Sequence, residues 1–192
     1  MNLPNKLTVL RLIATPLFLL ALLWEGLPHH YLIALVLFIL ASLTDMADGI
    51  IARRQHLITD FGKFLDPLAD KMLTTAAFLG FIGLGIGKGT VWVTFIVLVR
   101  EFLITSLRLI SANHSKVIAA NIFGKCKTVI QMVTVIVTLF AEYLISLGVI
   151  KGGLADFSHG LETGLLWASA ISAVISGVIY VKDNREFINS KK

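Results

Sequence analysis

Four aspartates stand in two neighbouring apolar stretches of a strongly hydrophobic chain, and they are the residues best suited to chemistry. Asp45 and Asp48 lie in the first stretch, and Asp66 and Asp70 lie in the second. One aspartate inside a membrane-spanning helix costs about 2.5–3.5 kcal/mol, and such residues generally face a protein interior or a cavity. Four of them at one junction therefore indicate catalysis or ion handling.

Helical spacing predicts that these carboxylates form two facing pairs. Asp45 and Asp48 are three residues apart, and Asp66 and Asp70 are four apart, so each pair shares one face of a helix. The connection of residues 54–61 reverses the chain, so the two faces can meet. Four adjacent carboxylates repel one another unless cations lie between them, and about two divalent ions would balance them. Hard oxygen ligands favour Mg²⁺, Mn²⁺ or Ca²⁺ over zinc.

The residues between the two pairs fit a phosphate ligand. A paired-metal site can clamp phosphate oxygens. Gly49, Ala52 and Gly62 leave room for a phosphate or nucleotide to approach the backbone, although small residues also serve helix packing. Arg53 offers a bidentate donor to phosphate, whereas Arg54 is better explained as a positively charged loop residue.

The elements that must position these residues are apolar helices. The chain has 192 residues, of which 56% are hydrophobic and 15% are charged, against about 25% charged in a soluble domain. With the single cysteine Cys126, neither an intrachain disulfide nor a cysteine-based metal site can form. We therefore expect an all-α integral membrane protein, with residues 1–192 forming one domain and the N-terminal stretch retained as a first helix. Six transmembrane helices are predicted over residues 7–24, 31–52, 65–86, 91–112, 128–147 and 161–181.

Lysines and arginines predict the orientation. The side that carries the N-terminus also carries the basic residues of the second and fourth loops and of the C-terminal tail, whereas the opposite side has only Lys88 and Lys151. By the positive-inside rule both termini are cytoplasmic, so the aspartates face the cytoplasm from a multi-pass protein of the cell membrane. The segment 111–127 is expected to be either a short interfacial helix or a solvated loop.

The aspartate stretch also resembles a known family. Its order is Asp45-x2-Asp48-Gly49-x2-Ala52-Arg53-x8-Gly62-x3-Asp66-x3-Asp70, which matches the signature of the CDP-alcohol phosphatidyltransferases with no departure. The six-span pattern is similar to that family over nearly the full chain. The resemblance implies a Mg²⁺- or Mn²⁺-dependent transfer of a phosphatidyl group from CDP-diacylglycerol to an alcohol, with release of CMP. No covalent nucleophile is evident near the cluster, which favours direct in-line transfer.

The resemblance also implies the role of each residue. It assigns Asp45, Asp48 and Asp66 as metal ligands, and Asp70 as a metal contact and the general base. The residues implied to bind CDP-diacylglycerol are Asp48, Gly49, Ala52, Arg53, Thr59 and Gly62. Thr59 lies outside the signature and could instead be a helix cap beside Asp60. A homodimer is the implied assembly, and small residues in the last span are suited to close helix packing.

Softer motifs concern the acceptor alcohol. Asn2-Leu3-Pro4-Asn5, Arg100-Glu101-Phe102, Arg108 and Gly124-Lys125-x-Lys127 resemble bacterial members that use glycerol 3-phosphate and form phosphatidylglycerophosphate. This dianionic acceptor needs cations beyond the metals, for which Arg108 and Lys125 are the first candidates. Arg100 and Lys127 are further candidates. Arg100 could instead pair with Glu101, and Lys127 could contact anionic lipid headgroups.

Two alternatives stay open. A transferase of the same family could use phosphatidylglycerol, serine or inositol phosphate as its acceptor. A divalent-cation transporter would also place acids inside a membrane, but it should carry polar groups along a path to the other face. We expect the outer halves of the first, second, fifth and sixth spans to be nearly featureless, which favours the enzyme.

Overall fold

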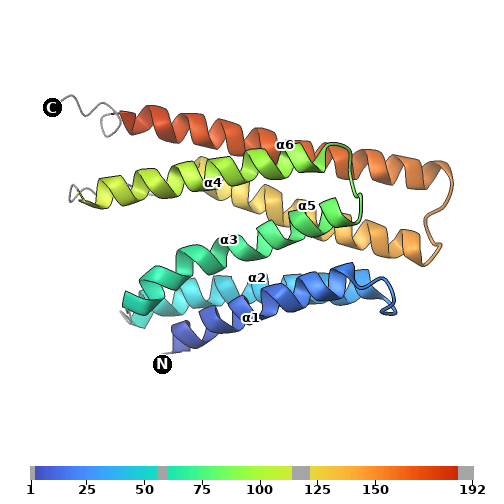
Figure 1. Ribbon diagram of the computed structural model, residues 1–192, viewed down its shortest axis with the longest axis horizontal. Helices are drawn as coiled ribbons and strands as arrows, with labels where there is room; N and C mark the ends of the chain where they lie inside the picture. Colours follow the sequence, from blue (N-terminus) through green and yellow to red (C-terminus); the bar gives the residue numbers. More distant parts are fainter. Residues whose placement is uncertain (1–2, 56–59, 114–121, 186–192) are drawn as a thin grey trace.

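Six helices make up the part of the chain that the structure describes. The computed structural model describes residues 3–55, 60–113 and 122–185, with side chains described over 7–44, 69, 71–108 and 122–185. These residues contain no strand, which confirms the all-α prediction (Figure 1). The helices are α1 (Leu3–Leu23), α2 (His30–Gln55), α3 (Asp60–Gly83), α4 (Thr90–Asn113), α5 (Ile122–Ser146) and α6 (Gly153–Asp183).

Successive helices run in opposite directions, which gives the bundle two distinct ends. The turns of residues 24–29, 84–89 and 147–152 lie at one end, here called the turn end (Figure 1). The start of α1 and the end of α6 lie at the opposite end, called the terminus end. α3 contacts the α1–α2 hairpin on one side and α4 and α5 on the other. Because α2 ends and α3 begins at the terminus end, all four aspartates lie in the halves of these helices nearest that end.

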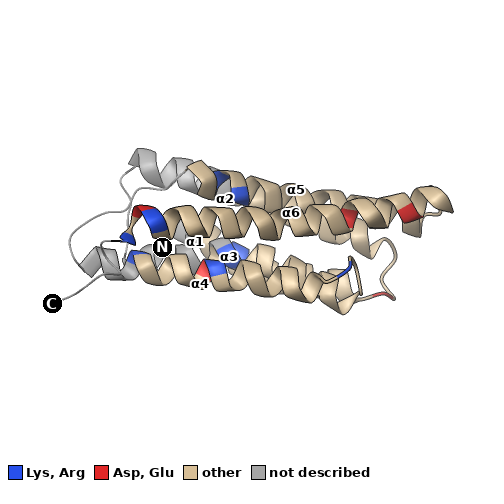
Figure 2. Cartoon of the chain, turned by 90° about the horizontal axis from the view of Figure 1, so that it is seen from above, with Lys and Arg blue, Asp and Glu red and all other residues tan. Residues whose placement is uncertain are grey.

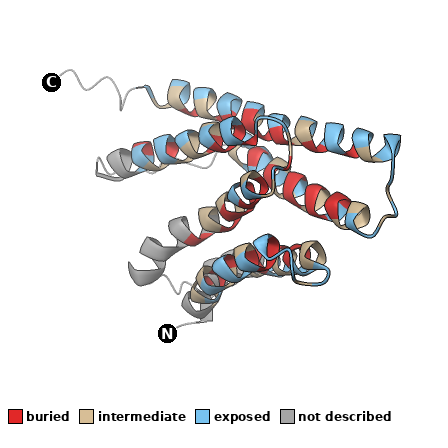
Figure 3. Cartoon of the chain, turned by 45° about the vertical axis from the view of Figure 1, so that its right-hand side comes forward, coloured by how far each residue is buried: buried red, intermediate tan, exposed pale blue. Residues whose placement is uncertain are grey.

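All six helices contribute to one apolar core, which lies along the axis of the bundle (Figure 3). Its largest members are phenylalanines with no exposed surface, Phe18, Phe38, Phe78 and Phe81. The ring centroids of Phe18 and Phe38 are 5.8 Å apart, which packs α1 against α2. Full burial of each such side chain contributes about 1.5–3 kcal/mol to folding, so these contacts hold the aspartate-bearing helices in place.

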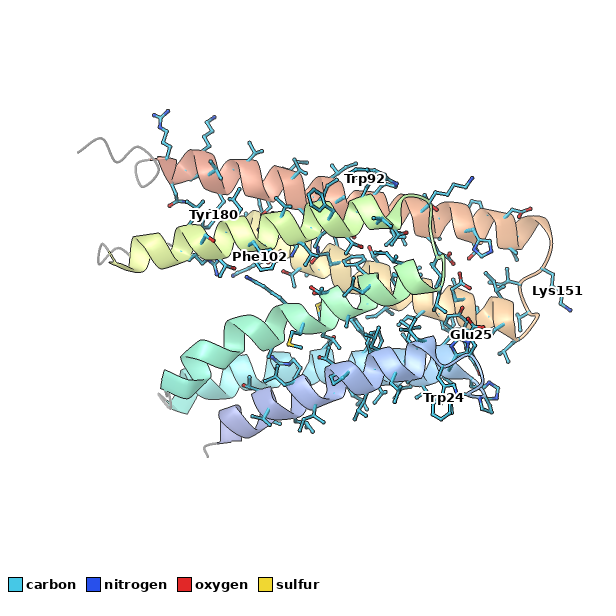
Figure 4. All side chains as sticks on the ribbon, viewed as in Figure 1. Trp24, Glu25, Trp92, Phe102, Lys151 and Tyr180 are labelled. Atoms are coloured by element: carbon cyan, nitrogen blue, oxygen red, sulfur yellow. The ribbon has the colours of Figure 1, made fainter. Side chains whose placement is uncertain are left out.

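The outer surface of the bundle is also apolar. Trp92 and Phe102 on α4 are 65% and 70% exposed, and large aliphatic side chains cover the outside of α1, α2, α5 and α6 (Figure 4). A surface of this kind would aggregate in water but suits contact with lipid. By length and composition, three segments within the described residues could cross a membrane, Thr90–Arg108, Ile122–Ser146 and Gly153–Asp183. These are the features of a membrane protein.

Four helices begin several residues earlier than their hydropathy predicts. α1 begins at Leu3 rather than at residue 7, and α3 begins at Asp60 rather than at residue 65. α5 begins at Ile122 rather than at residue 128, and α6 begins at Gly153 rather than at residue 161. The apolar run marks only the part of a helix that suits lipid, whereas backbone hydrogen bonding continues through the polar residues that precede it. Of the segment 111–127, the first residues belong to α4 and the last to α5, and residues 114–121 lie outside the described part.

The α3–α4 turn depends on glycine at one position in particular. Gly85 and Gly87 both have positive φ, 69° and 76°. A Cβ on Gly87 would lie 2.3 Å from Cδ1 of the fully buried Leu166, whereas a Cβ on Gly85 would have nothing within 4 Å. We expect Gly87→Ala to lower the free energy of unfolding by about 1–3 kcal/mol more than Gly85→Ala, because overpacking adds to the shared backbone strain. Thermal unfolding of both variants in detergent checks this, and equal losses would contradict it.

Candidate active site

The aspartates lie on the two helices that the sequence predicts. Asp45 and Asp48 belong to α2, and Asp66 and Asp70 belong to α3. Gly49, Ala52 and Arg53 follow on α2, and Gly62 precedes on α3, whereas Thr59 lies outside the described residues. The side chains of all these residues also lie outside the described part. The meeting of the two aspartate faces therefore stays a prediction.

Beside the aspartate-bearing half of α3 the structure places a group of charged side chains, here called the basic cluster: Lys71, Arg100, Glu101 and Lys127. Glu101 on α4 is its centre. Its Oε1 lies 3.0 Å from Nη1 of Arg100 and also accepts from Nζ of Lys127 on α5, and its Oε2 lies 3.6 Å from Nζ of Lys71 on α3. Three cations therefore share one carboxylate, and the charged segments of α3 and α4 lie next to one another (Figure 2). Such an excess of positive charge suits an anionic ligand.

Lys71 joins the basic cluster to the aspartates. It directly follows Asp70 in the chain, and its Nζ also donates to Oγ1 of Thr105 on α4. The turn of α3 that carries Asp70 is therefore held against α4, within one helical turn of the basic cluster. Sequence reasoning missed Lys71, although its position next to Asp70 was a usable signal.

Arg100 is held from both sides inside the bundle. Besides Glu101, it contacts α6, where its Nη2 donates to Oγ of Ser176 at 2.7 Å. A Cβ on Gly177 would lie 3.3 Å from Cγ of Arg100, so the glycine lets α4 and α6 approach closely. Of the two alternatives for Arg100, the structure contains the pair with Glu101.

Arg108 lies two turns beyond Glu101 on α4, towards the terminus end, and the residue is exposed. Its Nε donates to the hydroxyl of Tyr180 at 3.2 Å, and its Cζ lies 5.7 Å from the centroid of the same ring. Tyr180 is buried against Ile104 and Leu107. A buried aromatic ring therefore orients an exposed guanidinium, through a hydrogen bond and a cation–π contact. Lys125 is exposed on the first turn of α5.

The turn-end halves of α5 and α6 are not featureless, so that expectation was wrong. Glu142 on α5 and Glu162 on α6 are 8% and 0% exposed. The buried polar residues of α5 form one stripe along the helix, Lys127, Gln131, Thr134, Thr138 and Glu142. Single acids hardly change the hydropathy of a long apolar run, whereas burial requires a partner on another helix, which hydropathy cannot reveal. Polar groups are therefore present at the turn end, and the argument against a transporter that rested on their absence fails.

Comparison with known proteins decides the class. The sequence profile of the CDP-alcohol phosphatidyltransferases matches residues 1–175. The chain belongs to the CDP-alcohol phosphatidyltransferase family.

Within that family the chain is similar to the CDP-diacylglycerol–glycerol-3-phosphate 3-phosphatidyltransferase of Bacillus subtilis, with 36% identity over 200 residues and 98% of each chain covered. It is 38% identical over 183 residues to a probable phosphatidylglycerophosphate synthase of Mycobacterium tuberculosis, covering 94% of this chain and 80% of the relative. A Rickettsia bellii protein with the same name as the Bacillus relative is 34% identical, with 97% of each chain covered.

Proposed function

We propose that this protein transfers the phosphatidyl group of CDP-diacylglycerol to sn-glycerol 3-phosphate, which yields phosphatidylglycerophosphate and CMP. The basic cluster beside the Asp70-bearing turn of α3 is the observation that carries this proposal, because the acceptor is a dianion and needs cations next to the reacting centre. The relatives named for this reaction cover nearly the whole chain, which supports the choice of glycerol 3-phosphate among anionic acceptors.

The four aspartates are the proposed ligands of divalent metal. Carboxylate oxygens are hard donors, so a set of four fits Mg²⁺ or Mn²⁺, in a number of about two ions. Asp45, Asp48, Asp66 and Asp70 would hold them. Bound there, the ions would neutralise charge on the diphosphate of the lipid substrate.

The chain's own residues perform the remaining steps. Asp48, Gly49, Ala52, Arg53, Thr59 and Gly62 bind the CDP-diacylglycerol headgroup. Asp70 accepts the proton of the acceptor hydroxyl, whose oxygen then forms a bond to the β-phosphorus of CDP-diacylglycerol. The bond from that phosphorus to the bridging oxygen breaks, and CMP leaves with the bridging oxygen.

Arg108 and Lys125 bind the acceptor's phosphate. Tyr180 supports this assignment for Arg108, since it orients the guanidinium before any ligand arrives and so reduces the ordering cost of binding. Arg100 and Lys127 contribute positive charge while they remain ion-paired with Glu101. Arg100 then attracts the acceptor's phosphate mainly through its positive charge, without contacting the phosphate directly.

We further propose six membrane spans in the cell membrane, with residues 1–192 as one domain and two copies forming a homodimer. Both termini and the site face the cytoplasm. The distribution of described cations supports this orientation, because the turn end has Lys88 and Lys151 and the terminus end has the larger set, Arg11, Arg108, Lys125, Lys127, Lys182 and Arg185.

The decisive experiment is a product assay. The purified protein is incubated in mixed micelles with CDP-diacylglycerol, Mn²⁺ and one acceptor from a panel, and the lipid product is identified by mass spectrometry. We expect phosphatidylglycerophosphate with glycerol 3-phosphate, and no product in EDTA. A lipid product with serine or phosphatidylglycerol, and none with glycerol 3-phosphate, would contradict glycerol 3-phosphate as the acceptor. Metal flux into liposomes without release of CMP would support a transporter.

Arg108→Ala should separate the two substrates. A hydrogen bond to a charged group contributes about 1.5–3 kcal/mol, so we expect KM for glycerol 3-phosphate to rise about 10- to 100-fold while KM for CDP-diacylglycerol stays unchanged. Lys151→Ala is the matched control, because it removes an exposed cation at the turn end (Figure 4). Equal increases in KM for both substrates would show that Arg108 does not bind the acceptor specifically.

A further inference from the structure

A second group of metal-ligating side chains lies at the turn end, at the opposite end of the bundle from the aspartates. It consists of Glu142 on α5 and of His159 and Glu162 on α6. One ligand atom from each residue lies within 4.8 Å of the other two. We propose that these three residues form a second divalent-metal site, whose preferred ion is zinc.

The distances suit a single small ion. Zinc bonds to nitrogen and oxygen ligands are about 2.0–2.2 Å long, and a tetrahedral arrangement then separates neighbouring ligand atoms by about 3.3–3.6 Å. Nδ1 of His159 lies 3.2 Å from Oε2 of Glu162 and 3.7 Å from Oε1 of Glu142. Three protein ligands with a fourth position left for water is a common zinc arrangement.

The charges at this place also suit a cation. Two carboxylates that lie close together in a buried site repel each other. Glu162 accepts a hydrogen bond from Oγ of Ser158 at 3.4 Å, but Ser158 is neutral. His159 is half exposed and is a single partner for two acids. A divalent ion supplies the charge that balances both carboxylates.

The surroundings leave room for an ion and its water. Glu142 and His159 line a pocket of about 700 Å³, together with Asp156, Tyr31 and the α3–α4 turn. That turn is anchored to α6, where the Lys88 N–H donates to Oγ1 of Thr163 at 3.2 Å and Nε1 of Trp167 donates to the Lys88 carbonyl at 3.1 Å. The pocket wall is therefore built before any ion arrives.

An unsatisfied polar atom lies on the same stripe of α5. Thr138 precedes Glu142 by one turn of α5, on the same buried stripe. Its Oγ1 is buried and has no hydrogen-bond partner among the described residues. A water or an ion is one way to complete the hydrogen bonding of such a buried atom.

The nature of the ligands distinguishes this site from the aspartates. An imidazole nitrogen favours zinc over magnesium, whereas four carboxylates without a nitrogen ligand favour magnesium or manganese. Excess Mg²⁺ should therefore occupy the aspartates and leave zinc at the turn end. A bound ion would clamp α5 to α6 across the 147–152 turn and raise the unfolding temperature.

Zinc content measures this directly. The full-length protein in detergent is stripped with EDTA, incubated with zinc chloride in excess Mg²⁺, desalted and analysed by atomic emission. We expect the native chain to retain one more zinc per chain than Glu162→Gln or His159→Gln. Asp156→Asn, which alters an exposed carboxylate of the same pocket, should retain as much zinc as the native chain.

Thermal unfolding gives a second readout. In excess Mg²⁺, which occupies the aspartates, zinc should raise the unfolding temperature of the native chain and of Asp156→Asn, and should leave that of His159→Gln unchanged. His159 is half exposed, so its replacement tests the site even if Glu162→Gln fails to fold. Equal zinc content, or an equal shift in unfolding temperature, for the native chain and His159→Gln would overturn the proposal.

Discussion

Asp70→Asn should lower the rate of phosphatidyl transfer by about 10²- to 10⁴-fold, which is the usual contribution of a general base. The asparagine keeps an oxygen that can contact metal but cannot take up the proton of the acceptor hydroxyl. We therefore expect CDP-diacylglycerol binding to persist while CMP release nearly stops. Release of CMP from glycerol 3-phosphate reactions measures the first effect, and equilibrium binding of the lipid nucleotide measures the second.

Asp156→Asn is the control for this change, because it makes the same substitution on an exposed residue at the turn end. It should transfer phosphatidyl groups at the native rate. If Asp70→Asn reacts at a rate near that of the control, Asp70 is not the base. If it loses CDP-diacylglycerol binding as severely as turnover, Asp70 acts as a ligand rather than as the base.

Glu101→Gln should cause the largest loss of stability. It removes the carboxylate shared by Lys71, Arg100 and Lys127, each on a side chain that is at most 30% exposed. Breaking a buried ion pair by removing one partner costs about 3–5 kcal/mol, because the opposite charge stays behind. We expect a marked drop in unfolding temperature and in the yield of monodisperse protein from detergent.

Glu25→Gln is the matched control, since Glu25 is exposed in the turn of residues 24–29. Lys127→Met in the Glu101→Gln background should recover part of the lost stability by removing one of the cations left behind. If Glu101→Gln is as stable as Glu25→Gln, Glu101 does not hold the basic cluster together. If the double variant is no more stable than Glu101→Gln, Lys127 is not coupled to Glu101.

The sequence was informative wherever the relevant physics is local. Helix formation depends on neighbouring residues, so Asp45 and Asp48 were correctly placed on one helix and Asp66 and Asp70 on the next. The fixed gaps of the aspartate signature identified the family before any three-dimensional information, and the family profile agrees. Helix starts were less predictable, because hydropathy follows lipid contact rather than hydrogen bonding.

The sequence was less informative where partners come from different helices. It named Arg100, Arg108 and Lys127, but it did not indicate that Lys71 would reach Glu101 across the α3–α4 interface. It also treated the outer parts of α5 and α6 as plain apolar helix. Two acids that are well separated in sequence meet there only because the 147–152 turn folds one helix back along the other.

The sequence by itself therefore determined the helical class, the family and the aspartate signature, because these depend on composition, periodicity and spacing along one chain segment. The tertiary structure decided which cations share Glu101, how Tyr180 orients Arg108, and that Glu142, His159 and Glu162 come together. Ion pairs and metal ligands require atoms within a few ångströms of each other. Between helices, that proximity is set by how the core packs, which no local pattern in the sequence encodes.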